Sequence, residues 1–72
     1  METKRERFVR IAEARTNKAI DMIRLIGNCA NKSTYDYTEK DVNKIFDTLK
    51  RELNIAREQY NSANKKNNEF KL

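Results

Sequence analysis

The chain has 72 residues and a net charge of +5, and it contains one Gly, one Cys, no Pro and no His. A chain this short forms one domain with a small core, which oligomerisation often supplements. The inventory excludes an imidazole base, an internal disulfide framework and a Gly-rich phosphate loop. We therefore predict a helical protein that is not an enzyme and has no metal ion or cofactor.

The first predicted helix spans about residues 4–30. Thr3 and Glu6 have the spacing of a capping box, which satisfies free amides at a helix start. A stripe of apolar residues then recurs at alternating intervals of four and three, with Arg15 as its single interruption. The stripe consists of Phe8, Ala12, Arg15, Ala19, Met22, Ile26 and Cys29.

Further apolar residues widen the apolar surface of this helix to roughly 200° of its circumference. The residues that we expect to mediate self-association are Ile11, Ile20, Ile23 and Leu25. We expect Gly27 or Asn31 to end the helix, with Asn31 as a left-handed C-terminal cap.

The second predicted helix spans about residues 38–62. Thr38 and Asp41 form an acidic variant of the capping box. Its apolar stripe keeps the heptad spacing typical of a coiled coil without interruption. The stripe consists of Val42, Phe46, Leu49, Leu53, Ala56, Tyr60 and Ala63. Because this stripe is narrow, the second helix is expected to bury one line of side chains and expose the rest.

Antiparallel pairing of the two stripes gives a consistent register. Ala19 faces Leu49 and Ile26 faces Val42, and the residue numbers of each facing pair sum to 68. The midpoint of that register is residue 34, which falls in the short predicted link. The agreement between the stripes and the link predicts an all-α antiparallel helical hairpin.

The predicted domain organisation is one helical-hairpin domain, residues 1–62, followed by a tail, residues 63–72. The tail is rich in Asn and Lys, so we expect it to be flexible, polar and basic. The link, residues 31–37, has a length that joins antiparallel neighbours.

A single narrow neighbour cannot cover the wide apolar surface of the first helix. Each large aliphatic side chain left in water forgoes roughly 1.5–3 kcal/mol. We therefore expect a homodimer, most simply a four-helix bundle with the first helices inside. The alternative is a monomer in which the link, with Tyr35 and Tyr37, folds over the exposed flank.

Arg15 lies within the apolar stripe, beside the small residues Ala12 and Ala56 in the predicted register. One interpretation is a buried polar contact that specifies register or partner. The other is structural: the aliphatic stem packs along the core while the guanidinium reaches Glu52 or another acid at the edge.

The basic residues concentrate at the two chain ends, which meet in an antiparallel hairpin. The candidate nucleic-acid contacts are Lys4, Arg5, Arg7, Arg10, Lys65, Lys66 and Lys71. Glu2, Glu6 and Glu69 dilute this positive charge, and Glu6 is also spaced to pair with Arg10. No helix-turn-helix or zinc module is present, so phosphate contact is indicated rather than base reading.

No apolar run approaches the length of about 18 residues that a membrane span requires, and no apolar leader is visible. We therefore expect a cytoplasmic protein with no membrane association and no small-molecule substrate. The single Cys agrees with a reducing compartment.

Two segments carry a resemblance to a known family: RFVRIAEARTNKAIDMIRLIGNCAN and YDYTEKDVNKIF. They resemble an uncharacterised family of small proteins from low-GC Gram-positive bacteria, often encoded on plasmids, phages or integrative elements. The likeness covers about residues 5–60 and implies no activity. In architecture alone the chain is similar to Rop, a small hairpin that dimerises into a bundle and binds RNA pairs, but no Rop motif is present.

Two functions follow as expectations. The first is a small interaction or adaptor protein that self-associates through its first helix and binds a protein partner. The alternative is a small basic nucleic-acid-binding accessory or regulatory protein of a mobile element.

Overall fold

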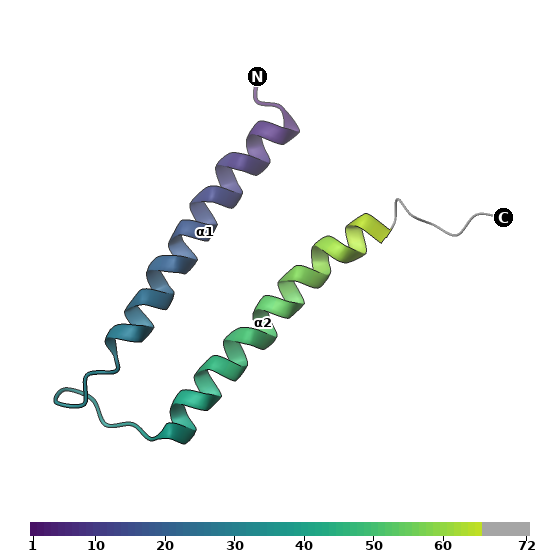
Figure 1. Cartoon of the computed structure of the whole chain (residues 1–72). Helices are drawn as coiled ribbons and strands as arrows, with labels where there is room; N and C mark the ends of the chain where they lie inside the picture. Colours follow the sequence, from purple (N-terminus) through teal and green to yellow (C-terminus); the bar gives the residue numbers. More distant parts are fainter. Residues whose placement is uncertain (66–72) are drawn as a thin grey trace. The chain divides into compact units, whose positions relative to one another are not determined.

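A computed structural model describes residues 1–65, which form two α-helices and no β-strand. Helix α1 spans Lys4–Asn28 and helix α2 spans Glu39–Lys65 (Figure 1). The all-α class and the helix–link–helix order of the predicted hairpin are confirmed. The two helices belong to separate compact units, one of residues 1–36 and one beginning at Tyr37, and each is described by itself.

Helix α1 begins at the predicted capping box. The Glu6 amide donates to Thr3 Oγ1 at 3.0 Å, and the Thr3 amide donates to Glu6 Oε1 at 3.0 Å. This reciprocal pair satisfies amides that would otherwise lack a partner in the first turn. The backbone hydrogen bond of the Thr3 amide lowers the pKa of the Glu6 carboxyl, with help from the Thr3 hydroxyl.

The end of α1 differs from the prediction. The helix ends at Asn28 rather than near residue 30, and no described residue has a positive φ, so the expected left-handed cap at Asn31 is wrong. Cys29 is the C-cap, and its amide donates to the Ile26 carbonyl at 3.1 Å, while the Ala30 amide donates to the Gly27 carbonyl at 3.1 Å. These shorter-range bonds satisfy the last carbonyls in a right-handed conformation, so a left-handed residue is not needed.

Asn31 instead organises the link. Its side-chain oxygen Oδ1 accepts from the Ser33 amide at 3.0 Å and from the Ser33 hydroxyl at 2.6 Å. Its carbonyl accepts from the amides of Thr34 and Tyr35 at 3.1 and 3.0 Å. An Asn side chain that bonds the backbone two residues ahead mimics a turn, which explains why the chain leaves the helix here.

Helix α2 also begins at its predicted capping box. The Asp41 amide donates to Thr38 Oγ1 at 3.2 Å, and the Thr38 amide donates to Asp41 Oδ2 at 2.9 Å. The helix continues to Lys65, three residues beyond the predicted end. No Gly or Pro follows residue 60 to stop it, and Asn61 Nδ2 donates to Glu58 Oε1 at 3.1 Å within its last turns.

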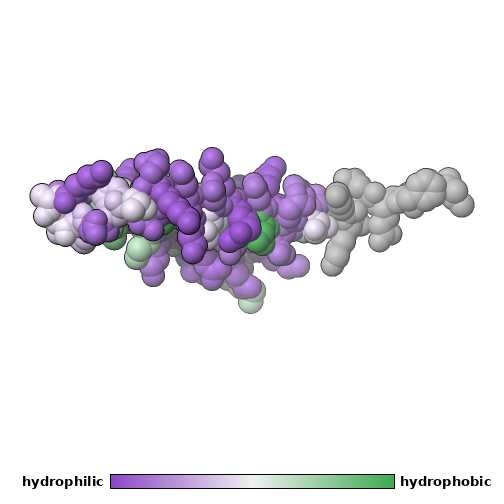
Figure 2. Space-filling model, turned by 90° about the horizontal axis from the view of Figure 1, so that it is seen from below, coloured by the Kyte–Doolittle hydropathy of each residue, from purple (hydrophilic) through white to green (hydrophobic). Residues whose placement is uncertain are grey.

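No residue of the described chain is buried. Twelve large apolar side chains are exposed, and the space-filling view shows a mostly hydrophilic face with isolated hydrophobic side chains (Figure 2). Within residues 1–65, neither helix combines the length and the apolar character needed to cross a bilayer. The apolar stripes of both helices therefore still expose side chains that packing against another helix would bury.

Candidate interaction surfaces

The predicted stripe of α1, here called its seam, divides the helix surface into two flanks. At about 100° per residue, side chains three or four residues apart share a face of the helix. The four residues predicted to mediate self-association do not form one patch. Ile11 and Leu25 lie on one side of the seam, whereas Ile20 and Ile23 lie on the other.

The flank of α1 that contains Ile11 and Leu25 carries cations and no carboxylate. We call it the cationic flank, and together with the seam edge it spans roughly 80° of the helix. Its residues are Lys4, Arg7, Ile11, Arg15, Lys18, Met22 and Leu25. Leu25 and Met22 are about half exposed, and Arg15 is an exposed residue of this helix. Cationic side chains and exposed apolar side chains therefore alternate along this flank.

The opposite flank of α1 is aliphatic near the seam and of mixed charge. Val9, Ile20 and Ile23 line it. Four charged residues share it, which are Arg5, Glu6, Glu13 and Arg24. Val9 is partly buried, while Ile20 and Ile23 are exposed. The two sides of α1 thus present apolar residues in different charge environments, cationic on one flank and mixed on the other.

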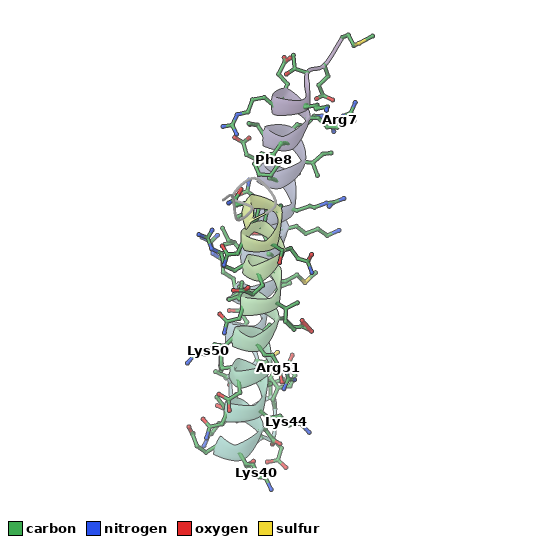
Figure 3. All side chains as sticks on the ribbon, turned by 90° about the vertical axis from the view of Figure 1, so that its right-hand side faces the viewer. Arg7, Phe8, Lys40, Lys44, Lys50 and Arg51 are labelled. Atoms are coloured by element: carbon green, nitrogen blue, oxygen red, sulfur yellow. The ribbon has the colours of Figure 1, made fainter. Side chains whose placement is uncertain are left out.

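The cations at the start of α1 are not arranged as one basic face. Lys4 and Arg7 lie on the cationic flank, whereas Arg5 and Arg10 lie on other sides of the helix. Arg5 lies over the ring of Phe8, with 5.9 Å between the guanidinium carbon and the ring centroid. Figure 3 labels Arg7 and Phe8 on this first part of α1.

Glu2 joins two of these cations. Arg10 donates through Nε to Glu2 Oε2 at 2.8 Å and through Nη2 to Oε1 at 3.0 Å, and Arg7 Nε lies 3.8 Å from Oε1. This two-pronged hydrogen bond lowers the pKa of Glu2 and raises that of Arg10. The expected Glu6–Arg10 pair is replaced, because the Glu6 carboxylate is engaged in the capping box.

The remaining predicted nucleic-acid contacts lie at the chain end. Lys65 is the last residue of α2, and its side chain lies outside the described part. Lys66 and Lys71 lie outside the described residues altogether. The structure therefore places only the first four predicted cations, and it gives two of them a carboxylate partner.

Helix α2 carries a flank that sequence reasoning missed. On one side of its seam, over roughly 80° of the helix, there are carboxylates and no Lys or Arg. We call it the carboxylate flank, and its residues are Asp41, Ile45, Thr48, Glu52 and Gln59. Ile45 is 43% exposed, so this flank also combines charged residues with an exposed apolar side chain. The signal was present in the spacing of Asp41 and Glu52, which lie three helical turns apart.

The side of α2 opposite its seam is polar and of mixed sign. Lys40, Lys44 and Arg51 project from it, as labelled in Figure 3, and Asp47 and Glu58 share it. Ile55, at the margin of this side, is 50% exposed. This surface offers matched control positions because it lies away from the seam.

Cys29 is exposed, and its thiol donates to the Leu25 carbonyl at 3.5 Å. Within residues 1–65, no group of three His, Cys, Asp or Glu side chains is placed to hold a metal ion.

Comparison with known proteins gives no match: no protein-family model, curated protein or solved structure is similar to this chain.

Proposed function

We propose that the protein is a non-enzymatic interaction protein whose helices pair as an antiparallel hairpin, whose hairpins self-associate, and whose assembly binds a protein partner. The proposal rests on one observation, the unequal apolar surfaces of the two helices. The stripe of α2 is about as wide as one neighbouring helix can cover, whereas apolar residues of α1 lie on its seam and on both flanks.

Energetics favour covering this surface. Met22, Ile23 and Leu25 are 54%, 46% and 55% exposed. Burying a large aliphatic side chain contributes roughly 1.5–3 kcal/mol, and a small domain is stable by only about 5–15 kcal/mol in total. Pairing the seams leaves the flanks of α1 uncovered, so a further helix is needed on at least one of them.

The chemistry of the flanks favours a protein as the covering partner. Ile11, Met22 and Leu25 are interleaved with the cations of the cationic flank. Phosphate-binding surfaces need the cations alone, whereas helix–helix interfaces use both apolar contact and charge at the rim.

Sedimentation equilibrium tests the proposal. We expect the mass of two chains at micromolar concentration. Leu25→Lys should raise the dissociation constant at least tenfold, because it replaces an apolar side chain of the cationic flank with a further charge. Asn17→Lys, on the polar side of α1, is the matched control and should leave the constant unchanged. A wild-type mass of one chain at every concentration would contradict self-association.

Nucleic-acid binding is a second candidate function, supported by Lys4 and Arg5, which form no ion pair within the described residues. Binding to a mixed-sequence duplex should then weaken steeply with salt, because each neutralised phosphate releases counterions. For six phosphate contacts, the affinity should fall by about 10³-fold or more between 50 and 200 mM salt. An affinity that is the same at both salt concentrations would contradict a phosphate-binding role.

A further inference from the structure

The cationic flank of α1 and the carboxylate flank of α2 are complementary in charge, and each contains aliphatic residues. The carboxylates of α2 are Asp41 and Glu52, with Ile45 between them. Both flanks lie on the same rotational side of their seams. If the helices pair antiparallel through their seams, as proposed above, the two flanks lie on one side of the hairpin.

From this complementarity we propose that a second copy of the chain docks on this side of the hairpin, with its α2 alongside the first copy's α1. The two links then lie at the same end of the bundle. This proposal rests on the self-association proposed above and adds to it which surfaces meet.

Two closed two-fold arrangements can stack hairpins through these flanks. With the links at the same end, each α1 neighbours the α2 of the second copy. With the links at opposite ends, α1 neighbours α1 and α2 neighbours α2. Apolar contact is available in both, so charge decides between them.

Charge at the middle of the bundle favours the first arrangement. The register that sums to 68 places Glu52 level with residue 16, between Arg15 and Lys18 and at the middle of α1. With links at the same end, Arg15 and Lys18 meet Glu52 of the second copy. With links at opposite ends and full overlap, they meet Arg15 and Lys18 of the second copy, and Glu52 meets Glu52.

Like charges that meet in this way are repulsive, and they are only weakly screened once an interface excludes water. No carboxylate lies on the cationic flank to relieve the repulsion, apart from Glu2, which contacts Arg7 at the N-terminal end. A surface of Leu and Ile alone would allow both arrangements. The segregated charges select one of them.

The single Cys of the chain allows a direct test. Cys29 is exposed and lies at the link end of α1. Spin labels at Cys29, measured by double electron–electron resonance, report the separation of the two link ends. With the links at the same end, the labels are separated only by the width of the bundle, below roughly 25 Å, since neighbouring helix axes lie 8–10 Å apart. With the links at opposite ends, about 26 residues of helical rise separate them, or about 39 Å.

A short distance that disappears on dilution with unlabelled chain supports the proposal. A distance near 39 Å overturns it and leaves self-association intact. No intermolecular distance, together with a mass of one chain, contradicts self-association itself.

Because the label at Cys29 lies next to the cationic flank, a second labelled protein is needed. The variant Cys29→Ser with Ser33→Cys moves the label into the exposed link, away from both flanks. The same short distance is expected from it. If it gives a long distance, the arrangement with links at the same end is wrong even if the Cys29 label gives a short one.

Discussion

Helices α1 and α2 are alike in length and in the way they begin, but they differ in what lies beside their seams. They have 25 and 27 residues, and each starts with a Thr whose hydroxyl and amide exchange hydrogen bonds with an acidic residue three positions ahead. The seam of α2 has polar flanks, interrupted on one side by Ile45. The seam of α1 has apolar residues on both flanks.

This difference shows that the residues that start a helix and the residues that decide how many neighbours it needs are separate features of the sequence. The capping boxes specify where each helix starts, and each consists of the same reciprocal pair of hydrogen bonds. The flanks specify how many neighbours each helix needs. A helix with one narrow stripe needs one neighbour, and α2 is of this kind. Helix α1 has apolar residues on both flanks and needs more than one neighbour, and this difference is the basis for proposing self-association.

The largest expected effect comes from breaking the seam of α2. Leu49 lies on the seam and is partly buried, whereas Ile55 lies near the opposite side and is 50% exposed. Leu49→Ala should lower the free energy of unfolding by about 2–5 kcal/mol, as for a packed aliphatic residue. Ile55→Ala should stay within about 0.5 kcal/mol, as for a surface change. Urea unfolding followed by circular dichroism measures both, and equal losses would refute the seam as the packed surface.

A smaller effect is expected from exchanging charge between the flanks. Glu52→Lys places a cation at the middle of both flanks, and Lys18→Glu places a carboxylate there on both. Each variant alone should associate roughly tenfold more weakly, a change of about 1.4 kcal/mol. A mixture of the two should associate as the wild type does, because each α1 then meets an α2 of opposite charge in the other chain.

The control for this exchange is Glu58→Lys, which makes the same substitution on the opposite side of α2 and should leave association unchanged. The double variant within one chain distinguishes the alternative. If the double variant associates as strongly as the wild type but the mixture does not, Lys18 and Glu52 pair within a chain. The proposed docking of a second copy is then wrong.

The features that could be predicted from the sequence are those encoded by neighbouring residues. Both capping boxes and the helix starts follow from four-residue patterns and are confirmed. The end of α1 was less predictable, because Asn31 is suited equally to a left-handed cap and to a side-chain turn. Only the competition between these two hydrogen-bonding patterns decides the outcome, and no pattern of residue types reveals it.

The interaction surfaces were only partly predictable for a related reason. Glu2 lies before the helix, eight residues from Arg10, and pairing rules within a helix consider three or four residues. The cations that follow Lys4 are close together in the sequence, but the turn of the helix separates them onto different sides. The carboxylate flank of α2 is not evident from the net charge of the segment, because equal numbers of acids and bases lie on different sides of the helix.

The smallest expected effect concerns the feature that the two helices share. Thr3→Ala and Thr38→Ala should each cost about 1 kcal/mol of stability, because each removes the acceptor for an amide in the first turn. If the helices differ only in their flanks, the two losses should be similar. Thermal unfolding of both variants measures this. Ser62→Ala, at an exposed position on the polar side of α2, controls for loss of a hydroxyl alone.

The same caps predict how stability depends on pH. The amides of Thr3 and Thr38 hold the pKa of Glu6 and of Asp41 below their ordinary values of 4.5 and 3.8. A carboxyl whose pKa is lowered by folding stabilises the fold above its unfolded pKa, and this contribution disappears as the pH falls through its folded pKa. Helix content should therefore be constant from pH 7 to about 5 and decline at lower pH. Asp41→Asn should reduce that decline in α2, since an amide does not titrate. If the acid transition of this variant is the same as that of the wild type, the Thr38–Asp41 cap contributes nothing to the pH dependence.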